Sequence, residues 1–222
     1  MDPAFWLENW EKGQTGFHLK DVNPALLRHW KDLGLDAAPC VLVPLCGKSV
    51  DLPFLRSLGH SVIGIELSPI AVETFWAELG VTPQKRVDQA LTFWESDEIE
   101  IIEGNFFSLN PEQIQRPCIV YDRAALIAMP PELQKQYATH LVALSQKAPI
   151  FMVTLDYQAE EMSGPPFPIT RSRLGELFDE WYEVSLIESR DALADNPGLA
   201  SRGLKSLSES IWILKPKKTS CN

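Results

Sequence analysis

The segment Cys40–Glu66, which reads CVLVPLCGKSVDLPFLRSLGHSVIGIE, decides the fold expected for this chain. An apolar run at 41–43 leads into a turn around Gly47, and an amphipathic stretch with leucines at helical spacing follows. A second apolar run at 62–65 ends on an acid, Glu66. This order predicts a strand, a turn, a helix and a second strand, which together form a βαβ unit.

Glu66 lies 19 positions after Gly47. In a dinucleotide-type βαβ unit, an acid about 20 residues beyond the glycine turn lies at the end of the second strand, where it can accept hydrogen bonds from ribose hydroxyls. The pair therefore predicts a small ligand that carries a ribose, bound at the carboxyl edge of a parallel sheet.

Composition narrows the class of protein further. The 222 residues suit one α/β domain, and 45% apolar with 23% charged residues is an ordinary soluble profile. A net charge of −10 repels phosphate backbones, which argues against nucleic acid, and no apolar run reaches the length of a membrane span. The start of the chain lacks signal-peptide features, and the four cysteines form neither a CxxC pair nor a zinc-like cluster. We therefore expect a cytoplasmic protein with reduced thiols and no metal.

The remaining pattern extends the βαβ unit into a single domain over residues 1–222. Helices are expected after Asn23, Ser68 and Pro130, and residues 81–98 are expected to form a polar connector with some helix. Further strands are expected at 99–102, 119–121, 150–155, 182–187 and 210–214. The last two lack a convincing helix between them, so they should pair antiparallel. The expected order is five β/α units and a closing hairpin.

Several ribose-containing ligands fit such a fold. Gly47-Lys48-Ser49 resembles the end of a P-loop, but Leu42 stands where that motif needs its first glycine. A dinucleotide fingerprint needs three glycines, and this turn has only Gly47. S-adenosylmethionine has a ribose but no phosphate, so it needs less glycine in the turn and an acid at the second strand. A class of methyltransferases combines that site with a terminal antiparallel hairpin.

Five stretches together resemble the thiopurine S-methyltransferase family, in particular its bacterial branch. They are WLENWEKGQTGFH (6–18), VPLCGKSVDLPFL (43–55), GHSVIGIELS (59–68), YDRAALIAMP (121–130) and GPPFP (164–168). The resemblance implies a monomeric, cytoplasmic class I methyltransferase, Rossmann-like, with helices on both faces of a seven-stranded, mostly parallel sheet and a C-terminal antiparallel hairpin. It implies methyl transfer from S-adenosyl-L-methionine to the sulfur of aromatic or heterocyclic thiols, with S-adenosyl-L-homocysteine as the product.

The resemblance also implies the site residues. It places residues 1–20 as a lid over the cofactor, and it assigns cofactor contacts to Trp10, Leu45, Glu66, Asn105, Phe106 and Arg123. Asn105 and Phe106 stand where mammalian members have a Ser-Ile pair. Arg123 is expected beside both cofactor and acceptor, with Phe17 facing the acceptor from the lid. Phe167, in a Pro165-Pro166-Phe167 run, is expected to form a rigid wall over the acceptor.

The chemistry of thiol methylation fits these residue types. A sulfonium carries an activated leaving group and a thiolate is a strong nucleophile, so the site needs alignment and exclusion of water more than a base. Arg123 could favour the anionic acceptor by its charge, or Asp122 and Arg123 could form only a structural ion pair. Three alternatives remain open: a methyltransferase for selenium, tellurium or halide acceptors, a nucleotide-binding oxidoreductase, and a non-catalytic ligand-binding relative.

Overall fold

A computed structural model describes residues 3–34, 40–114 and 119–218 of the chain. These residues fall into two compact units, 1–121 and 122–222. The division passes through β6 (Ile119–Arg123), whose first three residues belong to the first unit and whose last two belong to the second.

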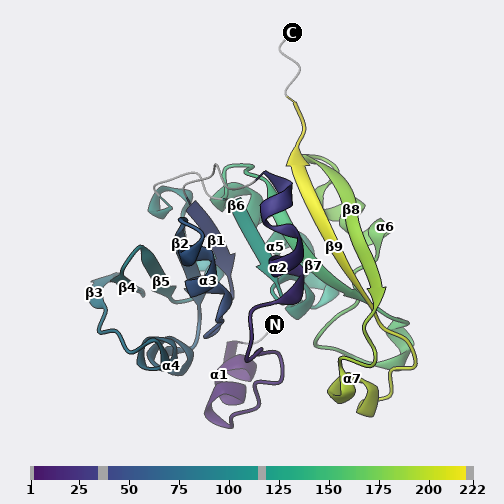
Figure 1. Cartoon of the computed structure of the whole chain (residues 1–222), viewed down its shortest axis with the longest axis horizontal. Helices are drawn as coiled ribbons and strands as arrows, with labels where there is room; N and C mark the ends of the chain where they lie inside the picture. The colour runs from purple at the N-terminus through teal and green to yellow at the C-terminus, as the bar shows by residue number, and fades with distance from the viewer. Residues whose placement is uncertain (1–2, 35–39, 115–118, 219–222) are drawn as a thin grey trace. The chain divides into compact units, whose positions relative to one another are not determined.

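The first unit contains the parallel part of the sheet. Its hydrogen-bonded strand order is β3-β4-β5-β2-β1-β6. β1 (Cys40–Pro44) pairs in parallel with β2 (Ser61–Glu66) and with β6, and β2 pairs in parallel with β5 (Ile99–Glu103). Every residue of β1 and β2 is buried, as expected for parallel strands covered on both faces. The βαβ unit predicted from Cys40–Glu66 is therefore confirmed (Figure 1).

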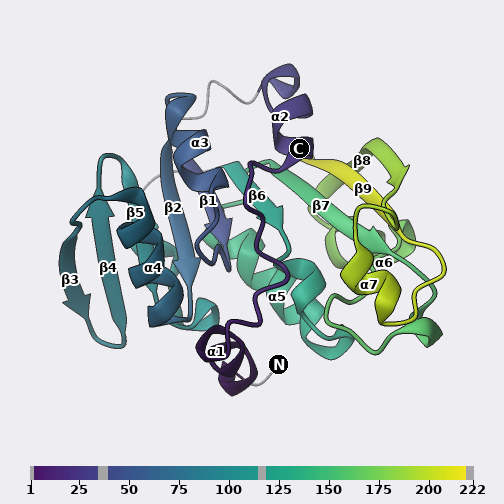
Figure 2. The ribbon, with the colours of Figure 1, turned by 60° about the horizontal axis from the view of Figure 1, so that its bottom comes forward.

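Two helices of the first unit pack on these strands. α3 (Asp51–Ser57) contacts β2, and α4 (Pro69–Leu79) contacts β2 and β5 (Figure 2). Ser68 caps α4, because its hydroxyl accepts a hydrogen bond from the amide of Ala71 at 3.3 Å. The helix ends at Gly80, which adopts φ +71°. The start of α4 after Ser68 was predicted from the sequence and is confirmed.

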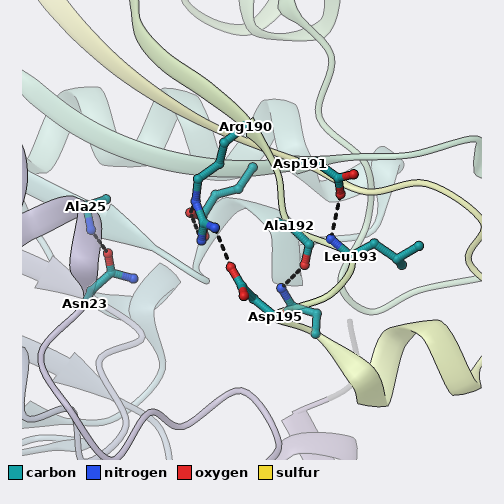
Figure 3. A network of polar contacts seen from close by, with 9 residues as sticks. Asn23, Ala25, Arg190, Asp191, Ala192, Leu193 and Asp195 are labelled. Carbon is teal, nitrogen blue, oxygen red and sulfur yellow. Dashed lines mark hydrogen bonds and ion pairs between the residues drawn. The ribbon is translucent and has the colours of Figure 1, made fainter.

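Asn23 caps α2 (Pro24–His29) in the same way. Its side-chain oxygen accepts from the amide of Ala25 at 2.8 Å, as Figure 3 shows. Its own amide donates to the buried carboxylate of Asp51 at 2.8 Å, and the second oxygen of Asp51 accepts from the Tyr121 hydroxyl at 2.9 Å. Asp51 thus joins the starts of α2 and α3 to β6. A short 3-10 turn, η1 (Lys31–Leu33), then leads to Gly34.

Residues 81–98 were predicted to form a polar connector with some helix, and this prediction is wrong. They form an antiparallel hairpin of β3 (Gln84–Asp88) and β4 (Leu91–Ser96), and β4 also pairs antiparallel with β5. The described residues thus hold nine strands in place of the expected seven. β3 is an edge strand exposed along its whole length, so it has no apolar alternation to detect. Its cations Lys85 and Arg86 lie 3.5 and 3.9 Å over the rings of Trp94 and Phe93, respectively.

The second unit contains the closing hairpin. β7 (Ile150–Asp156) pairs antiparallel with β9 (Ser208–Pro216), which pairs antiparallel with β8 (Tyr182–Asp191). The antiparallel ending is therefore confirmed. The long helix α5 (Pro131–Leu144) precedes β7, and α6 (Arg171–Phe178) contacts α5 and β8. Between β8 and β9 the chain forms a short helix, α7 (Pro197–Ser201), where no helix was expected (Figure 1).

Five short 3-10 turns lie in the loops among the residues that the structure describes. Besides η1 in the first unit, they include η3 (Phe106–Ser108) and η4 (Pro111–Gln113) there, and η5 (Leu126–Ala128) and η6 (Ala159–Glu161) in the second.

The prediction of reduced thiols is wrong for one cysteine. Cys40, fully buried at the start of β1, is disulfide-bonded, whereas Cys46 is a free, buried thiol. None of the described helices is long and apolar enough to cross a membrane.

Candidate active site

The turn after β1 forms the floor of the candidate cofactor site. Leu45 and Gly47 adopt positive φ angles of 49° and 56°, so the backbone reverses sharply as the strand ends. The amide of Cys46 donates to the carbonyl of Ile65 at 2.9 Å and holds the turn against β2. Gly47 is buried against Trp10, and a Cβ at this position would lie 3.2 Å from Trp10 Cζ2. Glycine is therefore required here for its backbone angle and for the close approach of the indole.

The Glu66 carboxylate at the end of β2 holds this turn through a hydrogen bond. Its Oε2 accepts from the amide of Gly47 at 2.8 Å, and its Oε1 accepts from the amide of Ser68 at 2.7 Å. The side chain is 7% exposed. Burial raises the pKa of Glu66, while the amides of Ser68 and Gly47 oppose that rise. Since a carboxylate offers about four lone-pair positions, each oxygen keeps one more position for a donor such as a hydroxyl.

Aromatic side chains of the N-terminal segment gather above the turn. α1 (Pro3–Glu11) carries Trp6 and Trp10 and ends before Gly13. Phe17 contacts Trp6 and Trp10 edge to face, with ring centroids 5.5 and 5.7 Å apart. The indole N–H of Trp6 is buried and has no hydrogen-bond partner among the described residues. The segment thus presents an aromatic cluster of Trp6, Trp10 and Phe17 with one unpaired donor.

The loop after β5 lies beside the end of β2. The amide of Gly104 donates to the carbonyl of Glu66 at 2.8 Å, which places Asn105 and Phe106 next to the Glu66 strand end. The side-chain oxygen of Asn105 accepts from the amide of Phe107 at 3.0 Å and caps η3. Phe106 is buried, with its ring 5.3 Å from that of Phe107. Asn105 therefore has a local structural role that its assignment as a cofactor contact did not anticipate.

In the second unit, a buried carboxylate organises the segment that follows Arg123. Asp122 accepts from the Tyr137 hydroxyl at 2.8 Å and from the Leu126 amide at 3.1 Å. Burial raises the pKa of Asp122 to about 6, and these two donors oppose the rise. The chain then turns through Ala124, which has φ +64°. Arg123 is half-buried at the end of β6, directly between the buried Asp122 and this turn.

Phe167 packs against the same segment. Its amide donates to the carbonyl of Ile127 in η5 at 2.7 Å. Its ring covers Gly164 so closely that a Cβ there would lie 2.6 Å from ring carbons, and Gly164 adopts φ +72°. The loop with Phe167 and the loop that follows Arg123 are therefore joined within one unit.

The predicted site residues thus form two groups. The first unit brings together Trp10, Phe17, Leu45 and Glu66, with Asn105 and Phe106 at the adjacent strand end. The second unit contains Arg123 and Phe167, which belong to segments joined by the Phe167–Ile127 hydrogen bond.

Sequence reasoning missed three contributors to these groups. They are the Ser68 amide, the buried pair of Asp122 and Tyr137, and the unpaired indole of Trp6. The helix cap at Ser68 was visible in the sequence and could have indicated the first. The described part of the chain holds no cluster of three or more His, Cys, Asp or Glu residues that could bind a metal ion.

The chain is similar to known proteins over nearly its whole length. The family model described as Thiopurine S-methyltransferase (TPMT) matches residues 1–217. The Thiopurine S-methyltransferase of Methylococcus capsulatus is 46% identical over 217 residues, which are 97% of this chain and 98% of that protein. The protein of the same name from Shewanella amazonensis is 41% identical over 218 residues, covering 98% of this chain and 100% of that protein.

Solved structures share the fold at low sequence identity. A SAM-dependent methyltransferase from Anabaena variabilis matches with a TM-score of 0.62 and 14% identity, over 97% of this chain and 95% of its own. The 1,6-didemethyltoxoflavin-N1-methyltransferase of Burkholderia thailandensis, solved with S-adenosylhomocysteine, matches with a TM-score of 0.60 and 15% identity, over 96% and 87%. The chain therefore belongs to the thiopurine S-methyltransferase family, and its fold is that of the class I S-adenosylmethionine-dependent methyltransferases.

Proposed function

We propose that this protein transfers the methyl group of S-adenosyl-L-methionine to the sulfur of aromatic or heterocyclic thiols such as thiopurines. The observation that carries the proposal is the Glu66 carboxylate at the end of β2, which accepts hydrogen bonds from the amides of Gly47 and Ser68. The Gly47 turn beside it packs against the indole of Trp10. Membership of the family over nearly the whole chain supports the same reaction.

The residues of the first unit fit the cofactor. Each Glu66 oxygen accepts one backbone amide and keeps a lone-pair position, so the carboxylate can receive ribose hydroxyls without losing its own support. The absence of a Cβ at Gly47 lets Trp10 approach the turn closely, and the indole supplies an aromatic surface there. Leu45 would contact the cofactor from the same turn, with Asn105 and Phe106 contributing from the neighbouring strand end.

The reaction requires little from the protein beyond placement. The bound cofactor supplies a methyl group on a positively charged sulfur, which is already an activated donor. The side chains have to orient the acceptor sulfur in line and exclude water. Arg123 would favour the anionic thiolate by its positive charge, and no strong base is needed. The buried Asp122 holds the turn after Arg123 through the Leu126 amide, so that this segment is fixed before the acceptor binds.

Aromatic side chains suit a planar, apolar acceptor. Phe17 would contribute from the N-terminal segment, acting as a lid, and Phe167 from the loop after β7. A net charge of −10 supports a small-molecule acceptor in preference to a nucleic acid. We propose that the protein acts as a cytoplasmic monomer.

The proposal is tested by methyl transfer from labelled S-adenosylmethionine to 6-mercaptopurine. Hypoxanthine, which has oxygen in place of the sulfur, serves as the matched control acceptor. We expect label on sulfur with the thiol and none with hypoxanthine. Saturable cofactor binding without transfer to any thiol would contradict the proposed acceptor, and the absence of cofactor binding would contradict the role of Glu66.

A further inference from the structure

The segment Gly164–Pro166 presents three consecutive carbonyl oxygens, and side chains hold all of them. Arg202 Nη1 donates to the Pro165 carbonyl at 2.7 Å, and its Nη2 donates to the Gly164 carbonyl at 3.5 Å. The Tyr157 hydroxyl donates to the Pro166 carbonyl at 2.6 Å. Two of the three residues are prolines without an N–H, so the segment has little backbone hydrogen bonding of its own to fix it.

Arg202 comes from a distant part of the second unit, the loop between β8 and β9. It directly follows α7, and its amide donates to the Leu199 carbonyl at 3.0 Å. Leu204 and Leu207 of this loop are buried in one cluster with Tyr157, Met162 and Ala192. The loop between β8 and β9 therefore packs on the loop after β7 and brings the guanidinium to its carbonyls.

A polar network fixes the beginning of the loop that carries Arg202. Arg190 at the end of β8 donates to Glu209 of β9 at 2.9 Å and forms an ion pair with Asp195 (Figure 3). Asp191 accepts from the Leu193 amide at 2.9 Å, and the Asn196 side chain donates to the Ala192 carbonyl at 2.8 Å. The loop thus has its own support, so that replacing Arg202 should leave its fold in place.

The carbonyls held by Arg202 adjoin Phe167. The Phe167 ring lies directly on Gly164, and its amide is fixed to the Ile127 carbonyl. Freedom at Gly164 or Pro165 would therefore let the ring tilt while its amide stays in place. Burial raises the pKa of Tyr157, so its hydroxyl stays protonated as the second donor at neutral pH.

We propose that Arg202 is a positioning residue that sets the Phe167 ring for the acceptor. The planar guanidinium of Arg202 donates to two adjacent carbonyls at once, and a side chain with a single donor nitrogen does this less well. The inference rests on the proposed function, because it takes Phe167 as part of the acceptor site. Arg202 is itself exposed, so its contribution to global stability is small.

The test compares R202M, which keeps the aliphatic stem and loses the donors, with R202K, which keeps one donor. R171M is the matched control, because Arg171 is an exposed arginine of the same unit whose partner is Asp179, directly after α6. We expect R202M to raise the KM for 6-mercaptopurine about fivefold, the effect of losing one net hydrogen bond. R202K should fall between R202M and wild type, and the KM for S-adenosylmethionine should stay unchanged in all three variants.

Hydrogen exchange of the peptide that contains Phe167 provides a readout that does not depend on turnover. We expect faster exchange of this peptide in R202M than in wild type and R171M. Unchanged exchange, or faster exchange with an unchanged KM for the thiol, would overturn the proposal. A wild-type protein that methylates no thiol would instead overturn the proposed function, and exchange would still decide whether Arg202 holds the Phe167 segment.

Discussion

Replacing Glu66 with glutamine should weaken the binding of S-adenosylhomocysteine about 10- to 100-fold. The change keeps the length and shape of the side chain and removes the charge. It also replaces one of the two oxygens that accept the Gly47 and Ser68 amides with an NH2 group. One of those amides would then face a donor, and the ribose would lose a charged acceptor.

The magnitude follows from the type of hydrogen bond that is lost. A hydrogen bond to a charged group contributes about 1.5–3 kcal/mol. At about 1.4 kcal/mol per factor of ten, this corresponds to a 10- to 100-fold change in the dissociation constant. The variant should also lose stability, since one buried amide is left without an acceptor, whereas removal of a buried charge offsets part of that loss.

Titration calorimetry with S-adenosylhomocysteine measures the effect. Glu103→Gln is the matched control, because Glu103 is the direct register partner of Glu66 on β5 and accepts from Trp94 Nε1 at 3.0 Å. The control should bind with the wild-type dissociation constant. A folded Glu66→Gln protein, verified by its thermal transition, that binds S-adenosylhomocysteine as tightly as wild type would refute the assignment of Glu66 to the ribose.

Three further variants test the two groups of site residues. Gly47→Ala places a Cβ 3.2 Å from Trp10 at φ +56°, so we expect weaker cofactor binding in calorimetry and about 1 kcal/mol lower stability. Burial raises the pKa of Asp122 from 3.8 to about 6, so the folded state favours the protonated carboxyl. The contribution of this group to the free energy of unfolding is therefore fully present below pH 3.8 and is lost as the pH rises through about 6. Relative to Asp122→Asn, wild type should therefore lose about 3 kcal/mol between about pH 4 and pH 7 in urea unfolding; a constant difference would contradict the shift. Tyr137→Phe removes a donor to the Asp122 carboxylate, so it should cost more stability at neutral pH than at pH 4, and an equal cost at both would exclude a bond to the charged form.

The elements that the sequence predicted best are those defined by local patterns. The strands of the Cys40–Glu66 unit are continuous apolar runs, and the caps at Asn23 and Ser68 are local hydrogen bonds within three residues. Such features depend on neighbouring residues and can be recognised without knowing the tertiary fold. The resemblance to the family likewise depends on short motifs in a fixed order.

The elements that were missed depend on distant partners. β3 is exposed on both faces and is a strand only because β4 pairs with it. Its turn contains Gln89 at φ +55°, not the glycine or asparagine that usually marks a two-residue hairpin loop. α7 is five residues long and has no apolar stripe of its own, so only its place between β8 and β9 explains it.

The sequence by itself determined the βαβ core, its glycine turn and the acid at its second strand, because spacing along a strand and a helix fixes where those residues lie. Only the tertiary structure decided that the Gly47 amide donates to the Glu66 carboxylate, and that Arg202 holds carbonyls near Phe167. Hydrogen bonds of this kind join residues that lie far apart in the chain, such as Arg202 and Pro165. No local pattern encodes them, because they form only when packing brings the loops together.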